Sequence, residues 1–188
     1  AFGFAPSPSG EVAAVITEPA VFNTGCILPQ PGYLELLREE TRKHGALLIF
    51  DEVITGFRLG AGGAQARFDV RPDITCFGKV IGGGLPIGAI GGSVAVMEHL
   101  SPIGPVFHAG TLSGNPIATA AGLAALDTLT SDVYIELMAR ARHLSALLRD
   151  ACEAAGFDAS FPVVGTLLGI VCGSEAGTVE NFDDAGAR

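Results

Sequence analysis

The chain has 188 residues, which is enough for one domain of ordinary size with a sizeable core. Its 48% hydrophobic and 16% charged residues are typical of a globular protein and exclude a disordered one. A formal net charge of −9 argues against nucleic acid or an anionic membrane surface as the main partner. The chain starts with Ala rather than Met, so we expect it to be a piece of a longer protein.

The four cysteines and four histidines are scattered along the chain without a metal-binding spacing. We therefore expect no metal site and reduced, buried thiols. No apolar run approaches the ~20 residues of a membrane span. The first residues also lack the basic segment of a secretion signal. Together these features predict a soluble, cytoplasmic protein that contacts no membrane.

The first half of the chain predicts a strand, a helix and a second strand. Residues 12–16 form a short apolar run that stops at Thr17-Glu18-Pro19 and leads into an irregular loop. Residues 33–43 place leucines on one helix face and charges on the other, which indicates an amphipathic helix. The apolar residues 46–50 follow as a second buried strand. This order is typical of a parallel crossover unit.

The candidate chemistry lies where the expected strands end. The second strand ends on Asp51 and Glu52, and a third, residues 74–77, ends on Gly78-Lys79. Open α/β sheets bind their ligands at such strand tips. Lys79 is one of two lysines and is set among glycines and aliphatic residues, where an ammonium is costly unless it has a use.

A desolvated lysine amine attacks aldehydes such as that of pyridoxal phosphate (PLP). The same cofactor needs an acid partner for its pyridine nitrogen, and Asp51 suits this role. On these residues alone, a loop-capping Asp51 and a solvent-directed Lys79 remain an equal alternative.

The glycines after Lys79 match neither phosphate-binding loop pattern. G-x-x-x-x-G-K-[ST] needs Gly and Ser or Thr where the chain has Asp73 and Val80, and G-x-G-x-x-G fails at Ile87. A nucleotide-binding module is therefore unsupported. We expect these glycines to let the backbone pass close to the lysine.

The remaining pattern predicts alternating short elements and two longer helices. Thr111, Ser113 and Asn115 stand before Pro116 as a polar turn and helix N-cap. The expected elements are a short helix at 65–69, a strand at 85–90, a short helix at 94–100, helices at 117–129 and 132–155, and a strand at 161–171.

Two segments, FDEV-x-x-GFR around Asp51 and FGKVIGGGLPIGA around Lys79, resemble the core of the class III (fold type I) PLP-dependent aminotransferases. The resemblance implies Lys79 as the Schiff-base lysine, Asp51 as partner of the pyridine nitrogen and Val53 packed on a ring face. It implies an α/β fold, the three-layer fold type I large domain, with a mostly parallel sheet and helices on both faces. Residues 1–130 would be part of this domain, and 131–188 the truncated start of a small C-terminal α+β domain.

Two more segments resemble one branch of this family, the glutamate-1-semialdehyde 2,1-aminomutases. In EPAVFNTG, Asn23 would reach the 3-oxygen of the cofactor ring, although composition alone makes it a turn residue. In AGTLSGNP, Thr111 would bind the cofactor phosphate of the partner subunit, which implies a homodimer. The implied reaction moves an amino group within glutamate-1-semialdehyde to give 5-aminolevulinate, a tetrapyrrole precursor, with Lys79 as general base and acid.

Three departures keep other interpretations open. His108 replaces an expected Gln and Ile90 an expected Tyr, which favours a related class III aminotransferase acting between an amine or amino acid and a keto acid or aldehyde. His108 as an acid/base group is a further alternative.

Arg58 is expected to pair with an acidic neighbour. The family's glycine-rich phosphate-binding turn has no counterpart here, so a non-catalytic truncated fragment is the third hypothesis.

Overall fold

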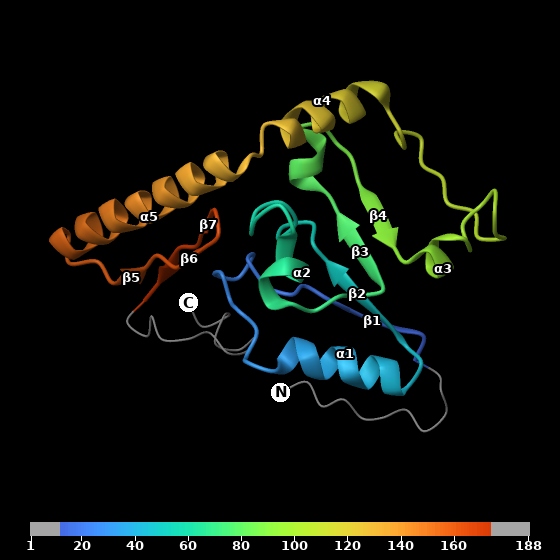
Figure 1. Ribbon diagram of the computed structural model, residues 1–188. Helices are drawn as coiled ribbons and strands as arrows, with labels where there is room; N and C mark the ends of the chain where they lie inside the picture. The colour runs from blue at the N-terminus through green and yellow to red at the C-terminus, as the bar shows by residue number, and fades with distance from the viewer. Residues whose placement is uncertain (1–11, 174–188) are drawn as a thin grey trace.

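A four-stranded sheet organises the first part of the molecule, as seen in a computed structural model that describes residues 12–173 (Figure 1). The Pro-, Ser- and Gly-rich residues 6–10 predict a loop at the start of the chain, which lies outside the described residues, as does the predicted end of the small domain beyond residue 173. The strands follow the order β1-β2-β3-β4 in the sheet. They are β1 (Ala14–Thr17), β2 (Leu47–Asp51), β3 (Ile74–Phe77) and β4 (Ala89–Gly92), with the first three parallel and β4 antiparallel to β3.

Helix α1 (Tyr33–Lys43) joins β1 to β2 and packs on one face of the sheet, which confirms the predicted crossover unit. Its Leu34 and Leu37 contact Leu48 and Phe50 of β2, and both β2 side chains are fully buried. Burial of side chains of this size stabilises the fold by about 1.5–3 kcal/mol each. An ion pair of 2.8 Å between Arg38 and Asp73 ties the same helix to the start of β3.

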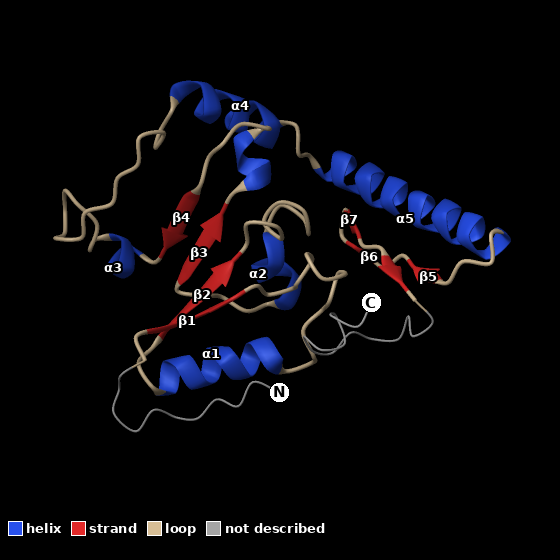
Figure 2. Ribbon diagram, turned by 180° about the vertical axis from the view of Figure 1, so that it is seen from behind, coloured by secondary structure: helices blue, strands red, loops and turns tan. Residues whose placement is uncertain are grey.

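The alternation of a strand sends neighbouring residues of β2 to opposite faces. Leu48 and Phe50 are buried, whereas Leu47, Ile49 and Asp51 are only half-buried. Asp51 therefore lies on the face opposite α1, at the C-terminal end of its strand. The two views from the front and from behind show the ends of β1, β2 and β3 at one edge of the sheet (Figures 1 and 2).

Most of the other elements lie close to their predicted positions. Strand β3 and helix α1 have the predicted bounds, and the two long helices differ by one or two residues at their ends. The helices are α2 (Gly63–Phe68), α3 (Val94–Met97), α4 (Pro116–Asp127) and α5 (Ser131–Ala154). A one-turn 3₁₀ helix, η1 (Lys79–Gly82), follows β3 and was not anticipated.

Two predicted strands are wrong in position or extent. The strand expected at 85–90 begins only at Ala89, because Pro86 has no N–H to donate to a sheet. The single strand expected at 161–171 is instead broken at Gly165, whose φ of 63° turns the chain back. Its pieces are β6 (Val163–Val164), β7 (Leu167–Leu168) and β8 (Val171–Cys172), the last paired with β5 (Ala159–Ser160).

Helix α5 and the short strands β5 to β8 form a second region beside the sheet (Figure 2). Three hydrogen bonds connect this region to the loop after β2 within the described residues: the Tyr134 hydroxyl donates to the Phe57 carbonyl at 2.9 Å, and the Thr166 hydroxyl and N–H donate to the Arg58 carbonyl at 3.0 and 3.1 Å. The division into two domains at residue 130 remains a prediction. No helix within residues 12–173 is long and apolar enough to span a membrane.

Candidate active site

Asp51 ends β2 with its carboxylate held by the chain that follows. Its Oδ1 accepts a hydrogen bond of 3.0 Å from the Val53 N–H, so the turn after the strand fixes the side chain. Val53 in turn lies against Gly78, where an added Cβ would meet the valine Cγ1 at 3.3 Å. The turn after β2 and the lysine turn after β3 therefore pack against each other, and Val53 is the side chain between them.

Lys79 begins η1 directly after Gly78. Its φ of 48° is in the left-handed region, which is uncommon for a residue with a side chain and costs about 1 kcal/mol or more. The side chain is exposed, which agrees with the solvent-directed alternative and not with the desolvated lysine that the sequence also allowed. The physical reason is that its neighbours Gly78 and Gly82–Gly84 have no side chains to cover it.

Helix α4 holds the lysine turn in place through contacts between backbones. A Cβ added to Gly122 of α4 would overlap the carbonyl oxygen of Ile81 and lie 3.1 Å from its carbonyl carbon. A Cβ added to Gly83 would overlap the carbonyl oxygen of Ala121. Gly83 therefore serves close packing of the lysine turn on α4, with Gly122 as a partner that the sequence did not identify, whereas the predicted close approach of backbone to the lysine stays a prediction.

Electrostatic effects place Asp51 and Lys79 in one neighbourhood, together with Glu18. Burial raises the pKa of the Glu18 carboxyl above its ordinary value; the Asp51 charge raises this pKa further and the Lys79 charge lowers it. Burial and the Asp51 charge also raise the pKa of the Cys76 thiol on the facing position of β3. Carboxylate and amine therefore meet at the same edge of the sheet. Glu18, which directly follows β1, is therefore a further charged group beside the two candidate residues.

Glu52 points to the other side of the strand and is almost fully buried at 1% exposure. Its carboxylate accepts hydrogen bonds from the Ala64 N–H at 2.6 Å, the Thr55 hydroxyl at 3.1 Å and the Gln65 amide at 3.0 Å. The Gln65 amide also donates to the Thr75 hydroxyl of β3 at 3.1 Å. This network connects the glycine-rich loop and α2 to the sheet, so Glu52 organises the loop beside the site.

The two loop residues assigned from the resemblance are exposed. Asn23 lies in a turn that is closed by paired hydrogen bonds between Val21 and Ile27. Thr111 lies in the long segment between α3 and α4, which runs away from the sheet in Figure 1. Asn115 caps α4 by accepting from the N–H groups of the next turn, as predicted. The structure brings Asp51, Val53 and Lys79 together, whereas Asn23 and Thr111 make no side-chain hydrogen bond to them within residues 12–173.

Arg58 differs from its prediction. Its guanidinium donates to the Ile54 carbonyl at 3.4 Å, and no carboxylate of the described residues lies within ion-pair distance of it. Burial lowers the pKa of this group. No local pattern indicates this arrangement, because the loop that surrounds Arg58 contacts Thr166, more than a hundred residues away.

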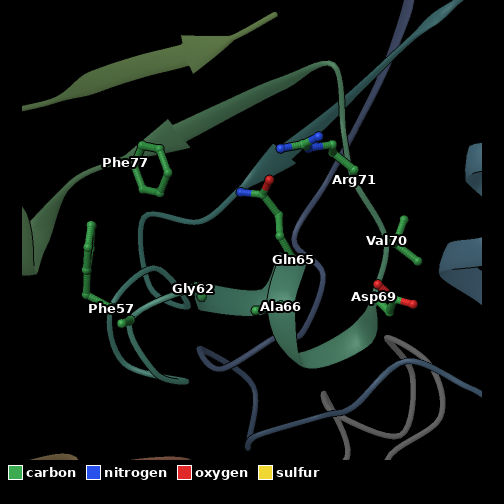
Figure 3. A pocket seen from close by; sticks show the side chains of 10 residues that line it. Phe57, Gly62, Gln65, Ala66, Asp69, Val70, Arg71 and Phe77 are labelled. Carbon is green, nitrogen blue, oxygen red and sulfur yellow. The ribbon is translucent and has the colours of Figure 1, made fainter. Parts of the chain in front are cut away.

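A cavity of about 510 Å³ opens beside α2 rather than over the lysine (Figure 3). The rings of Phe57 and Phe77 line one side, with centroids 5.9 Å apart, and Gln65 and Arg71 line the other. Neither Asp51 nor Lys79 contributes to this cavity. We place the candidate chemistry at the strand tips, because the acid and the amine lie there and both of their charges act on the same Glu18 carboxyl.

The residues at the strand tips fit a PLP ring. A carboxylate held by a backbone N–H, an exposed amine and a small branched side chain between them are the groups that such a ring needs at its nitrogen, its aldehyde and its face. No group of three His, Cys, Asp or Glu residues in the described part of the chain is arranged to hold a metal ion.

Sheet and site together define an α/β fold of the PLP-dependent transferase type, fold type I. The sequence model of the aminotransferase class-III family matches residues 6–186, and the chain belongs to this family.

Several curated relatives that share one name match most of the chain. The glutamate-1-semialdehyde 2,1-aminomutase of Desulfosudis oleivorans is 53% identical over 85% of this chain and 38% of its own length. The protein of that name from Syntrophobacter fumaroxidans is 59% identical over 77% of this chain and 34% of its own length. The chain thus spans well under half the length of these relatives.

Solved structures confirm the fold. A β-phenylalanine aminotransferase from Variovorax paradoxus has a TM-score of 0.82 at 38% identity, covering 95% of this chain and 41% of the other. A glutamate-1-semialdehyde-aminomutase from Pseudomonas aeruginosa, in complex with PMP, has a TM-score of 0.73 at 32% identity, covering 86% of this chain and 38% of the other.

Proposed function

We propose that the full-length protein binds PLP at the tips of β2 and β3 and uses it to move amino groups. Lys79 is the residue that would hold the aldehyde, Asp51 would face the ring nitrogen, Val53 would lie on a ring face and Asn23 would reach the ring oxygen. When bound, PLP supplies an electron sink for negative charge at a substrate carbon. Asp51 favours the protonated ring nitrogen, and the Lys79 amine, free to move on its exposed side chain, transfers protons at the substrate carbons.

The reaction that we propose is the intramolecular conversion of glutamate-1-semialdehyde to 5-aminolevulinate. One observation carries this choice: relatives of that name from several bacteria are 49–59% identical over 146–175 residues of this chain. The matches of 175 residues are long enough that they must span the loop with Asn23, both strand tips and the segment with Thr111.

The test is to supply the purified full-length protein with glutamate-1-semialdehyde as the sole substrate and to measure 5-aminolevulinate. We expect turnover without any added amino acceptor, and loss of turnover in Lys79→Ala. Glu39→Gln, an exposed change on α1, is the matched control and should keep wild-type turnover. No product from a folded, PLP-loaded wild-type protein would exclude the aminomutase.

A second candidate is a class III aminotransferase that exchanges amino groups between two substrates. Three transaminases among the structural neighbours favour it, because they reach TM-scores of 0.79–0.82 with this chain and the aminomutases 0.72–0.73, while an ornithine aminotransferase from Plasmodium yoelii has 0.68. The departures at His108 and Ile90 point the same way. Turnover that requires an external keto acid or aldehyde would select this candidate and reject the first.

We also propose that the protein acts as a homodimer in which Thr111 binds the cofactor phosphate of the partner subunit. Two features support this: Thr111 is exposed, and the segment that carries it extends away from the sheet of its own chain (Figure 1). The segment also exposes several large apolar side chains, namely Ile103, Val106, Phe107 and Leu112. Surfaces of this kind are typical of interaction sites.

A further inference from the structure

Glu18 is a charged group at the candidate site to which the proposed function gives no task. It directly follows β1, and the parallel register pairs Thr17 of β1 with Phe50 of β2. One residue further along, Glu18 therefore lies beside Asp51, on strands that are about 4.8 Å apart. The two chain positions after Glu18, Pro19 and Ala20, are buried, so the backbone at this point is fixed.

The charges around Glu18 are those of the site itself. Asp51 at the end of β2 and Lys79 at the start of η1 both act on its carboxyl, and the Cys76 thiol of β3 is the next titratable group on that edge. In their ionised forms, the carboxylates of Glu18 and Asp51 and the amine of Lys79 together carry one formal negative charge. A proton on a ring nitrogen beside Asp51 would compensate this charge, whereas a neutral ring would not.

We propose that Glu18 is a positioning residue for PLP that acts through Asp51: the two strand-end carboxylates together keep a bound pyridine nitrogen protonated and thereby tighten cofactor binding. The proposal rests on the proposed PLP site. Asp51 makes the direct contact, and Glu18 adds negative potential from the neighbouring strand. The coupling acts through space, because no hydrogen bond joins the two carboxylates in the described residues.

The effect has a defined pH dependence. Because the pKa of Glu18 is raised in the folded protein, its negative charge is present above that raised value and is lost as the pH falls through it. The contribution of Glu18 to PLP binding should therefore be present above the raised pKa and be lost as the pH falls through it. A structural role for Glu18 would show no such dependence.

The experiment measures the dissociation constant of PLP for the apo form of the full-length protein by calorimetry, across the range from neutral to mildly acidic pH. We expect Glu18→Gln to weaken binding about five- to tenfold at neutral pH, the size of one charge acting at short range near a protein surface. The wild-type affinity should approach that of Glu18→Gln as the pH falls. Glu18→Asp keeps the charge and should stay within about twofold of wild type, and the exposed Glu39→Gln should be unchanged.

Several outcomes would overturn the inference. Equal PLP affinity of Glu18→Gln and wild type at neutral pH would do so, as would the same pH dependence in both. If Glu18→Asp loses as much affinity as Glu18→Gln, packing rather than charge is responsible. Thermal melting of the apo proteins identifies a misfolded variant. If Glu18→Gln is misfolded, the PLP affinity of Glu18→Asp relative to wild type decides between charge and packing. A folded wild-type protein that does not bind PLP at all would reject the proposed function together with the inference, whereas the other failures leave the proposed function intact.

Discussion

Replacing Gly122 with Ala tests whether α4 positions the lysine turn. An Ala Cβ at this position would lie 3.1 Å from the Ile81 carbonyl carbon and overlap its oxygen. Carbon atoms normally pack at about 3.5–4.0 Å, so even the carbon is about 0.4–0.9 Å too close. The obstacle is backbone, which cannot rotate away as a side chain would. The helix and η1 must therefore separate by roughly that distance or more.

Two opposing terms decide the sign of the effect. Ala is favoured over Gly inside a helix by about 1 kcal/mol, which would stabilise the protein. Overpacking against a rigid neighbour costs about 1–3 kcal/mol. Because the obstacle is a carbonyl group, we expect the upper end of that range and a net loss of about 1–2 kcal/mol. Separation of α4 from η1 should also displace Lys79 and weaken PLP binding.

Denaturant unfolding and a PLP titration of the same full-length variant check this reasoning. Gly91→Ala in β4 is the matched control, since nothing lies within 4 Å of the new Cβ and its backbone is not left-handed. We expect that control to be neutral or slightly stabilising. A Gly122→Ala protein that is as stable as this control and binds PLP normally would refute the role of the close contact.

Three further predictions follow from the site. Glu52→Ala leaves three hydrogen-bond donors unpaired in a buried place and should destabilise the protein by about 3–5 kcal/mol, measured by thermal melting. Mixing Lys79→Ala with Thr111→Ala subunits should restore part of the activity that each lacks, because a mixed dimer then contains one complete site. Burial raises the pKa of the Cys26 thiol to about 11, so its alkylation rate should keep rising with pH up to that value.

Controls separate these effects from general damage. Glu39→Ala, which is exposed, should leave the melting temperature unchanged, and an equally small change in Glu52→Ala would mean that the buried network contributes little. Mixtures that stay inactive after subunit exchange would contradict a phosphate contact from the partner. Cys172 is exposed, and its alkylation should be much faster than that of Cys26 at pH 8; equal rates would contradict the effect of burial.

The sequence alone was sufficient for the parts of the fold that depend on local pattern. Helix α1 was predicted to the residue because its leucines recur at helical spacing, and β3 because Pro72 and Gly78 bound a short apolar run. Asp51 and Lys79 are candidates because Asp51 directly follows such a run and Lys79 stands one glycine beyond another. The strand predicted at 161–171 is wrong in extent, because its apolar residues conceal a turn at Gly165 that only the left-handed backbone reveals.

The site features that sequence could not supply are contacts between distant segments. Nothing in the local pattern shows that Gly122 faces Ile81, or that Glu18 and Asp51 become neighbours through the register of two strands. The network of Glu52 depends on α2 folding back over β2, twelve residues later. The exposure of Lys79 was also left undecided, because glycine-rich surroundings read as apolar in sequence but provide no covering atoms in space.

The adjacent pair Asp51 and Glu52 has a consequence for any change in the length of β2. Successive residues of a strand alternate between its two faces, so these two acids look in opposite directions although they differ by a single methylene group. Deleting one residue of β2 before Asp51 would exchange the two orientations. The Asp51 side chain would then point into the protein interior and the Glu52 side chain toward the proposed cofactor. Homologues that vary in this region should therefore tolerate insertions in pairs far better than singly.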